Sequence, residues 1–203
     1  MAVPTAWPPL LEPAPTPPGR ALSIEEWAGL GEDEPGELVG GHLEIEEVAD
    51  ATHELCVTWL IRVLGAWLAG RGFVFGSELK MALGPNRGRK ADVVVLLPGA
   101  KAPPRRGALH EPPDVVIEVV TPTPRDERRD RVEKMSEYAR FGVRFYWLVD
   151  PALGSFEIFE RAPAGFTQVV AVTEGTIDCV PGCDGLAVDV DALWAELARL
   201  RAE

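Results

Sequence analysis

One acidic residue, Glu118, lies inside an apolar stretch and constrains what this chain can fold into. Its neighbours are apolar at odd and even positions alike: Val115, Val116, Ile117, Val119 and Val120. Such a run is typical of a strand that is covered on both faces. An ionised carboxylate in that position is costly unless a cation or strong hydrogen-bond donors meet it. Its partner is either a buried Arg or Lys of an ordinary core or the cation of a metal site.

The elements predicted around this strand mix helices and strands. Helical spacing and capping signals predict a short helix after Ser23 and helices over residues 52–69, 126–141 and 190–200. Strand patterns cover a hairpin with Gly40-Gly41 at residues 37–46, and residues 73–83, 92–97, 114–120, 144–149, 156–161 and 166–172. This order predicts an α/β fold, with a mixed β-sheet flanked by helices. We expect residues 21–203 to form a single domain that follows a disordered Pro-rich tail over residues 1–20.

Charge and cysteine content limit the classes of function. The net charge of −12 argues against a polyanionic partner, but 14 of the 20 basic residues and only 9 of the 32 acidic residues lie between positions 80 and 144. Such a cluster is either a solvated face or a nucleic-acid contact. The three cysteines have no zinc-site spacing, and no apolar segment is long enough to cross a bilayer. We therefore expect a cytoplasmic protein without a membrane partner.

Two further residues are placed to share a site with Glu118. Asp92 opens the next apolar run, and on a neighbouring strand the two carboxylates would form a pocket suited to Mg²⁺ or Mn²⁺. Lys134 lies on the following helix in a stripe with Asp130 and Tyr138, spaced i, i+4. This stripe is either a solvated face with an ordinary Asp130–Lys134 pair or a face whose lysine reaches back to the carboxylates.

The segment between this strand and the helix is rich in proline and hydroxyl groups. The prolines of Thr121-Pro122-Thr123-Pro124 are expected to delay the helix until about Asp126, and the hydroxyls either cap it or contact a phosphate. On the helix itself, a second stripe is expected to face the core: Val132, Met135 and Ala139.

Several segments taken together resemble a known family. They are Asp92-Val-Val-Val, Pro113-Asp-Val-Val-Ile-Glu118-Val-Val-Thr121-Pro122, Asp130-x-x-x-Lys134 with Tyr138, and Tyr146-Trp-Leu-Val-Asp150-Pro151. They resemble the Uma-two endonuclease family, a bacterial branch of the PD-(D/E)-x-K nuclease-like superfamily. A weaker likeness, which includes His53, extends over residues 22–197.

The resemblance implies a restriction-endonuclease-like fold and a metal-dependent site. In that site Asp92 and Glu118 hold Mg²⁺ or Mn²⁺, the backbone carbonyl of Val119 adds a ligand, and Lys134 completes the catalytic group. The superfamily motif has its lysine two residues after the glutamate, where this chain has Val120. The resemblance places the lysine on the following helix instead. Asp130, Tyr138 and Thr121 are expected to support the site, and Arg125, Arg128 and Arg129 to contact nucleic acid.

Three functions are compatible with these features. The first is a Mg²⁺-dependent endonuclease that hydrolyses DNA phosphodiester bonds, with Lys134 in an electrostatic role. The second is a non-catalytic DNA-binding or regulatory module on a nuclease fold, and the third is a metal-dependent hydrolase of a small phosphate compound. No nucleotide-binding loop is present, so no organic cofactor is expected. A two-fold homodimer is the expected assembly.

Overall fold

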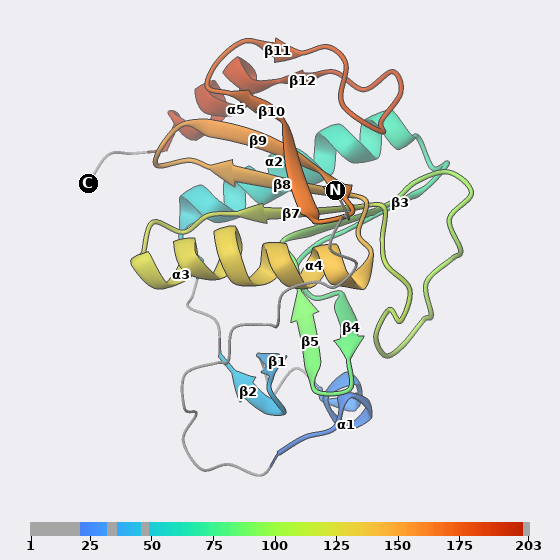
Figure 1. Ribbon diagram of the computed structural model, residues 1–203. Helices are drawn as coiled ribbons and strands as arrows, with labels where there is room; N and C mark the ends of the chain where they lie inside the picture. The colour runs from blue at the N-terminus through green and yellow to red at the C-terminus, as the bar shows by residue number, and fades with distance from the viewer. Residues whose placement is uncertain (1–20, 32–35, 46–48, 201–203) are drawn as a thin grey trace, which may run out of the picture.

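The large sheet forms the centre of the computed structural model, which describes residues 21–31, 36–45 and 49–200 (Figure 1). The Pro-rich tail predicted for residues 1–20 lies outside the described residues. This sheet has six strands in the order β10-β9-β8-β7-β6-β3. Their bounds are β3 (Phe73–Phe75), β6 (Val93–Leu96), β7 (Val115–Val119), β8 (Phe145–Asp150), β9 (Ser155–Ala162) and β10 (Gly165–Val172). β7 and β8 are parallel and the other pairs are antiparallel, so the sheet is mixed as predicted.

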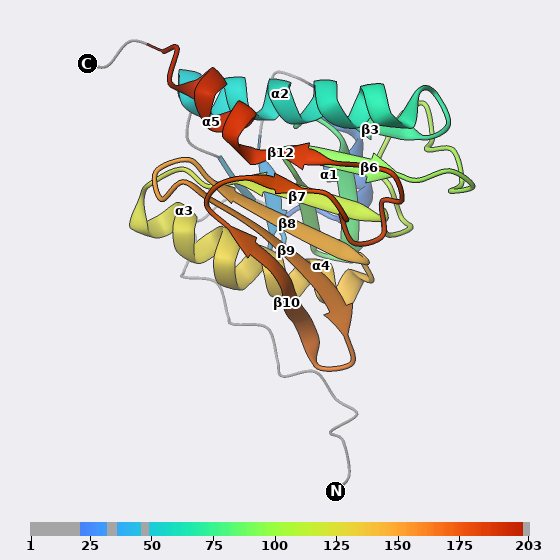
Figure 2. The ribbon, with the colours of Figure 1, turned by 90° about the horizontal axis from the view of Figure 1, so that it is seen from above.

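Helices cover both faces of the large sheet, as Figure 2 shows from above. One face packs against α2 (Ala51–Leu68) and α5 (Val190–Leu197), and the other against α3 (Pro124–Arg128), η1 (Arg129–Lys134) and α4 (Met135–Phe141). Side chains of β7 alternate between the two cores: Ile117 belongs to the same core cluster as Leu64 of α2, and Val116 to the same cluster as Tyr138 of α4. The double burial of this strand and the α/β fold class are therefore confirmed.

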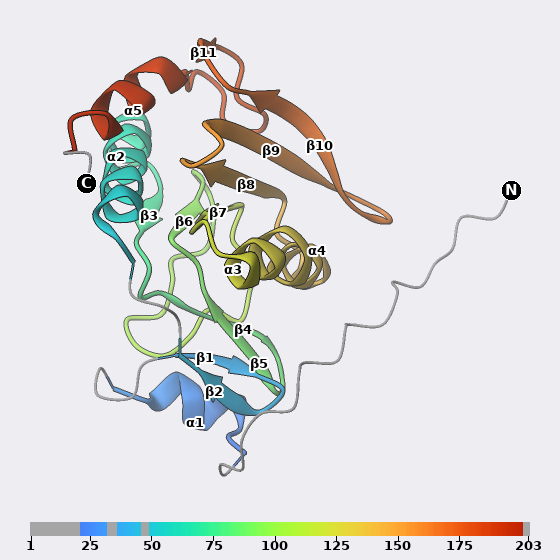
Figure 3. The ribbon, with the colours of Figure 1, turned by 90° about the vertical axis from the view of Figure 1, so that its left-hand side faces the viewer.

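A smaller antiparallel sheet lies beside the α3–α4 side of the large sheet (Figure 3). Its order is β2-β1-β5-β4, with β1 (Glu37–Val39), β2 (His42–Glu44), β4 (Lys80–Gly84) and β5 (Arg87–Lys90). It is covered by α1 (Ile24–Gly29), which begins with the predicted capping box of Ser23 and Glu26. Trp27 of α1 is fully buried over Gly88, where an added Cβ would lie 2.3 Å from the indole ring. β11 (Thr176–Ile177) and β12 (Val188–Asp189) form a short pair before α5.

The strand predicted over residues 73–83 is wrong. It is two strands that belong to different sheets, because β3 pairs with β6 and β4 pairs with β5. The chain leaves the large sheet at a turn around Gly76 and Ser77 and enters the small one. β5 then returns it through Ala91 to β6, so that Asp92 lies where the two sheets meet.

The helix after β7 differs from the prediction in its start and in its orientation. It begins at Pro124 rather than Asp126, because Thr123 caps it and proline is tolerated in the first turn. Residues 129–134 are π-helical. Of the stripe predicted to face the core, Ala139 is buried and Met135 packs against the core, but Val132 is 46% exposed, whereas Asp130 and Lys134 are buried. The charged stripe faces inward because its groups find ionic partners in the interior.

None of the helices in the described part of the chain has the length and apolar character needed to cross a membrane.

Candidate active site

Paired strands bring Asp92 and Glu118 together. In the antiparallel β6–β7 register Val93 pairs with Ile117, so the next position along places Asp92 opposite Glu118. The Oδ2 atom of Asp92 accepts a hydrogen bond of 2.7 Å from the backbone N–H of Val119. Two carboxylates that are 26 positions apart in the sequence thus occupy neighbouring positions on two hydrogen-bonded strands. The Val119 peptide joins them through its N–H, and a metal-ligand role for its carbonyl stays a prediction.

Lys134 turns inward to these carboxylates. Its Nζ atom lies 3.1 Å from Oε2 of Glu118, 3.7 Å from Oδ1 of Asp130 and 3.8 Å from Oε1 of Glu37. The lysine side chain is 2% exposed, so the interpretation of this stripe as a solvated face is wrong. Tyr138 donates its hydroxyl proton to Oε1 of Glu118 at 2.7 Å. Both oxygens of Glu118 therefore have donors, as a buried carboxylate requires.

A second group of buried ions, which the sequence pattern did not reveal, connects the small sheet to this site. Arg89, whose side chain is 1% exposed, donates to Glu37 at 2.6 Å and forms a two-pronged pair with Glu137 at 2.6 and 3.1 Å. Glu37 also accepts the backbone N–H of Lys90 at 2.8 Å. Glu37 is the link, because its other neighbour is the ammonium of Lys134. β1 and β5 are too short for their alternation to have revealed these inward charges.

The charge balance differs between the two ends of this network. Burial raises the pKa of Glu118 well above its usual value; Lys134 opposes this rise, and the charge of Asp92 adds to it. Burial likewise raises the pKa of Asp92, against the influence of Lys134 and His53. For Glu37, burial alone would raise the pKa, but the charges of Lys134 and Arg89 lower it to about 2. Nearby positive charge therefore outweighs the effect of burial on the pKa of Glu37, but it does not do so for Asp92 and Glu118.

This deficit fits a divalent cation beside Asp92 and Glu118. Mg²⁺ prefers oxygen ligands and is commonly held by one or two carboxylates, with water molecules filling the other positions. Within the described residues no group of three or more His, Cys, Asp or Glu side chains is arranged to hold a metal. The candidate ligands Asp92 and Glu118 are two carboxylates, which suit a hard cation that retains water better than a zinc ion.

The predicted supporting residues lie at different depths. Asp130 is buried, and its backbone carbonyl accepts a hydrogen bond of 3.0 Å from Tyr146. Thr121 lines a cavity of about 190 Å³ next to the site, which His53 also lines. The hydroxyl that caps α3 belongs to Thr123, through a bond of 3.2 Å from the N–H of Asp126. Thr123 rather than Thr121 therefore caps α3, and Thr121 is part of the cavity wall.

The three arginines predicted to contact nucleic acid differ in their exposure. Arg129 is 16% exposed and pairs with Asp126 at 2.7 Å and with Asp130 at 3.5 Å, so its charge serves the fold. Arg128 is 63% exposed and lies 3.4 Å from Glu133. Arg125 is exposed on the first turn of α3. A contact between these residues and nucleic acid stays a prediction.

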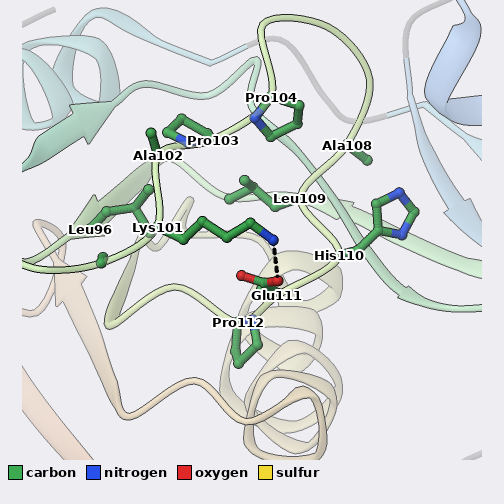
Figure 4. A pocket seen from close by; sticks show the side chains of 11 residues that line it. Leu96, Lys101, Ala102, Pro103, Pro104, Ala108, Leu109, His110, Glu111 and Pro112 are labelled. Atoms are coloured by element: carbon green, nitrogen blue, oxygen red, sulfur yellow. Dashed lines mark hydrogen bonds and ion pairs between the residues drawn. The ribbon is translucent and has the colours of Figure 1, made fainter.

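A larger cavity, of about 360 Å³, lies away from these residues (Figure 4). It is formed by the loop between β6 and β7, with Leu96 and Leu109 in its wall and an ion pair of 2.6 Å between Lys101 and Glu111 beside it. None of the candidate site residues lines it. Cavity size alone therefore does not locate the chemistry of this protein.

The mixed sheet, its helical layers and the buried carboxylates define a restriction-endonuclease-like α/β protein. The family model Uma2, described as "Putative restriction endonuclease", matches residues 23–191, and the chain belongs to this family. A crystal structure of a putative nuclease belonging to DUF820 from Anabaena variabilis ATCC 29413 superposes with a TM-score of 0.68 at 15% sequence identity, over 87% of this chain and 99% of that chain. At this identity the likeness concerns the fold. No curated protein matches the chain. The family predicted from the sequence is confirmed, and membership supports a nuclease.

Proposed function

We propose that the protein is a Mg²⁺-dependent endonuclease that hydrolyses phosphodiester bonds in DNA. The observation that carries this proposal is the buried contact of 3.1 Å between Lys134 and Glu118, next to Asp92. A chain that has Val120 where the superfamily motif has its lysine still brings an ammonium to the carboxylates, from the following helix. Membership of the Uma2 family supports the same conclusion.

Each residue of the site has a distinct role in this proposal. Asp92 and Glu118, with the carbonyl of Val119, would hold Mg²⁺ or Mn²⁺, which when bound supplies positive charge and activates water. Tyr138 holds Glu118 in position through its hydrogen bond of 2.7 Å. The three carboxylates within 3.8 Å of Lys134 favour the ammonium over the free amine. Lys134 therefore stabilises negative charge that develops on the phosphate and is not the general base.

We further propose that the protein works in the cytoplasm as a dimer. Its three cysteines are free, which suits a reducing cytoplasm. The outer strands β10 and β2 end the two sheets and offer edges for pairing, so we propose a two-fold homodimer. The exposed Arg125 and Arg128 beside the end of β7 are proposed to contact the DNA backbone.

Cleavage of supercoiled plasmid in Mg²⁺ or Mn²⁺ tests the proposal. The variants are Asp92→Asn, Glu118→Gln and Lys134→Met, and the matched control is Lys101→Met, whose lysine is 76% exposed in another loop. We expect the wild type and the control to nick the plasmid, and each site variant to lose on the order of 100-fold in rate or more. Equal nicking by all proteins would identify a contaminant and end the catalytic assignment.

A binding measurement separates catalysis from DNA binding alone. A short DNA duplex is titrated with protein at low and then at higher salt, because phosphate contacts are strongest at low salt. Binding without cleavage by the wild type would favour a non-catalytic DNA-binding module. Failure of both assays, with hydrolysis of a small phosphodiester, would favour the small-phosphate hydrolase.

A further inference from the structure

Four buried charges join the small sheet to the helical segment that carries Lys134 (Figure 3). On the sheet, the β1–β5 register places Glu37 opposite Arg89. On the helical segment, Glu137 lies three positions after Lys134, about one turn further along. The signs alternate from Lys134 to Glu37, Arg89 and Glu137, with successive contacts of 3.8, 2.6 and 2.6 Å. The set therefore ties two elements together at two points.

Glu37 is held firmly within this set. Its Oε2 atom accepts a hydrogen bond from Arg89 at 2.6 Å, and its Oε1 atom accepts the backbone N–H of Lys90 at 2.8 Å. Arg89 is fixed in turn by its two-pronged pair with Glu137, because a planar guanidinium that is bound at both ends has little freedom. The carboxylate of Glu37 is thus fixed relative to both the small sheet and the helical segment.

The side chain of Lys134 needs such a fixed partner. Its ammonium stands on a flexible four-carbon stem, and it contacts Glu118 of the large sheet at 3.1 Å and Glu37 of the small sheet at 3.8 Å. A divalent cation at Glu118 would compete with the ammonium for that carboxylate and repel it as a like charge. Glu37 is an anion in a different sheet, and its attraction for the ammonium would persist.

We propose that Glu37 is the positioning residue for Lys134, and that Arg89 fixes Glu37 for this purpose. The inference rests on the proposed nuclease function and makes the small sheet a part of its active site. Glu37 acts through the lysine and does not touch the substrate. Stability alone does not require these charges, since buried ion pairs are often no more stabilising than apolar side chains of similar volume.

NMR of the lysine side chains tests the positioning without cleavage. The chain has four lysines, so ¹³C-lysine labelling gives few signals, and Lys134→Met assigns the one of interest. The two ε-methylene protons have separate shifts when the side chain keeps one orientation and a common shift when it is mobile. With Mg²⁺ present, we expect separate shifts for Lys134 in the wild type and merged shifts in Glu37→Gln. Shifts that stay apart in Glu37→Gln would overturn the inference.

A double-mutant cycle in plasmid cleavage gives an independent readout. Glu37→Gln should lower kcat by about 10-fold and leave KM within about 2-fold, because the lysine acts on charge that develops during the reaction. In the Lys134→Met background the same change should alter kcat by less than about 2-fold, since the residue through which Glu37 acts is gone. An equal loss in both backgrounds would overturn the inference, because a merely structural role lowers the folded fraction in either one.

Two controls separate position from stability. Leu193→Ala removes a buried side chain of α5, on the other face of the large sheet, and should act equally in both backgrounds. Glu44→Gln, opposite Glu37 on β2, should cleave as the wild type does. If Glu37→Gln does not fold, Glu37→Asp decides, because it keeps the charge and shortens the reach by one methylene. It should lower kcat by about 3-fold or more, and only when Lys134 is present.

The failures of the two ideas are distinguishable. If Glu118→Gln is inactive while Glu37→Gln cleaves at the wild-type rate, the positioning role is wrong and the nuclease function stands. If the wild type itself does not cleave, the nuclease function is wrong, and the ε-methylene shifts of Lys134 decide whether Glu37 positions the lysine.

Discussion

Removal of the charge on Glu37 should destabilise the protein by about 3 kcal/mol at neutral pH, and much less in acid. The carboxylate is buried and accepts hydrogen bonds from Arg89 at 2.6 Å and from the N–H of Lys90 at 2.8 Å, with Lys134 at 3.8 Å. Burial by itself would raise its pKa, but Lys134 and Arg89 lower the pKa from 4.5 to about 2. At about 1.4 kcal/mol per pH unit, this difference corresponds to about 3 kcal/mol.

The sign of the pH dependence follows from the lowered pKa. The stabilisation is fully present above the unfolded pKa of 4.5 and is lost as the pH falls through the folded pKa of about 2. Urea unfolding of the wild type and Glu37→Gln at a series of pH values measures the difference directly. We expect a gap of about 3 kcal/mol at pH 7 that falls to about half near pH 3.

Glu44→Gln is the matched control, because Glu44 lies opposite Glu37 in the β1–β2 register but is only half-buried. We expect it to change stability by no more than about 0.5 kcal/mol at either pH. A penalty for Glu37→Gln that is equal at pH 3 and pH 7, or below about 1 kcal/mol at pH 7, would refute the electrostatic argument.

Protons and Mg²⁺ should compete at the carboxylate site, because burial raises the pKa of Glu118. Calorimetry should therefore show proton release on Mg²⁺ binding and tighter binding as the pH rises, with less release in Glu118→Gln. Gly88→Ala should destabilise the protein by about 1–3 kcal/mol in urea unfolding, because its Cβ would lie 2.3 Å from the ring of Trp27. Gly65→Ala, on α2 with no atom within 4 Å of the added Cβ, should instead stabilise it by about 0.5–1 kcal/mol. Thr123→Ala should cost about 1 kcal/mol through loss of the cap of α3, and unchanged melting would contradict that assignment.

The elements that the sequence predicted well are those with strong local patterns. β7 is apolar at successive positions, and only a strand with both faces covered accommodates that pattern. α2 shows helical spacing over many residues, and the structure ends it at Leu68. A turn without a strong sequence signal is harder to predict: the pattern over residues 73–83 predicts one strand, but the turn near Gly76 sends its two halves to different sheets.

The orientation of the helix after β7 was beyond local reasoning. Helical periodicity shows which residues share a face, but two stripes competed, one charged and one apolar. The charged stripe lies inside because Glu118 and Glu37 from two different sheets meet its lysine. The rule that charged residues lie on the surface cannot predict this arrangement, because the partners of the lysine come from other parts of the chain.

The sequence by itself determined that Glu118 lies in a buried strand, that it needs a cationic or hydrogen-bonding partner, and that Asp92 and Lys134 are candidates. Only the tertiary structure decided how these needs are met. Lys134 lies 16 positions from Glu118, and Arg89 lies 52 positions from Glu37 and 48 from Glu137. Ionic contacts over such separations depend on which strands pair and which helix face turns inward, and these are properties of the whole packed chain rather than of any short segment.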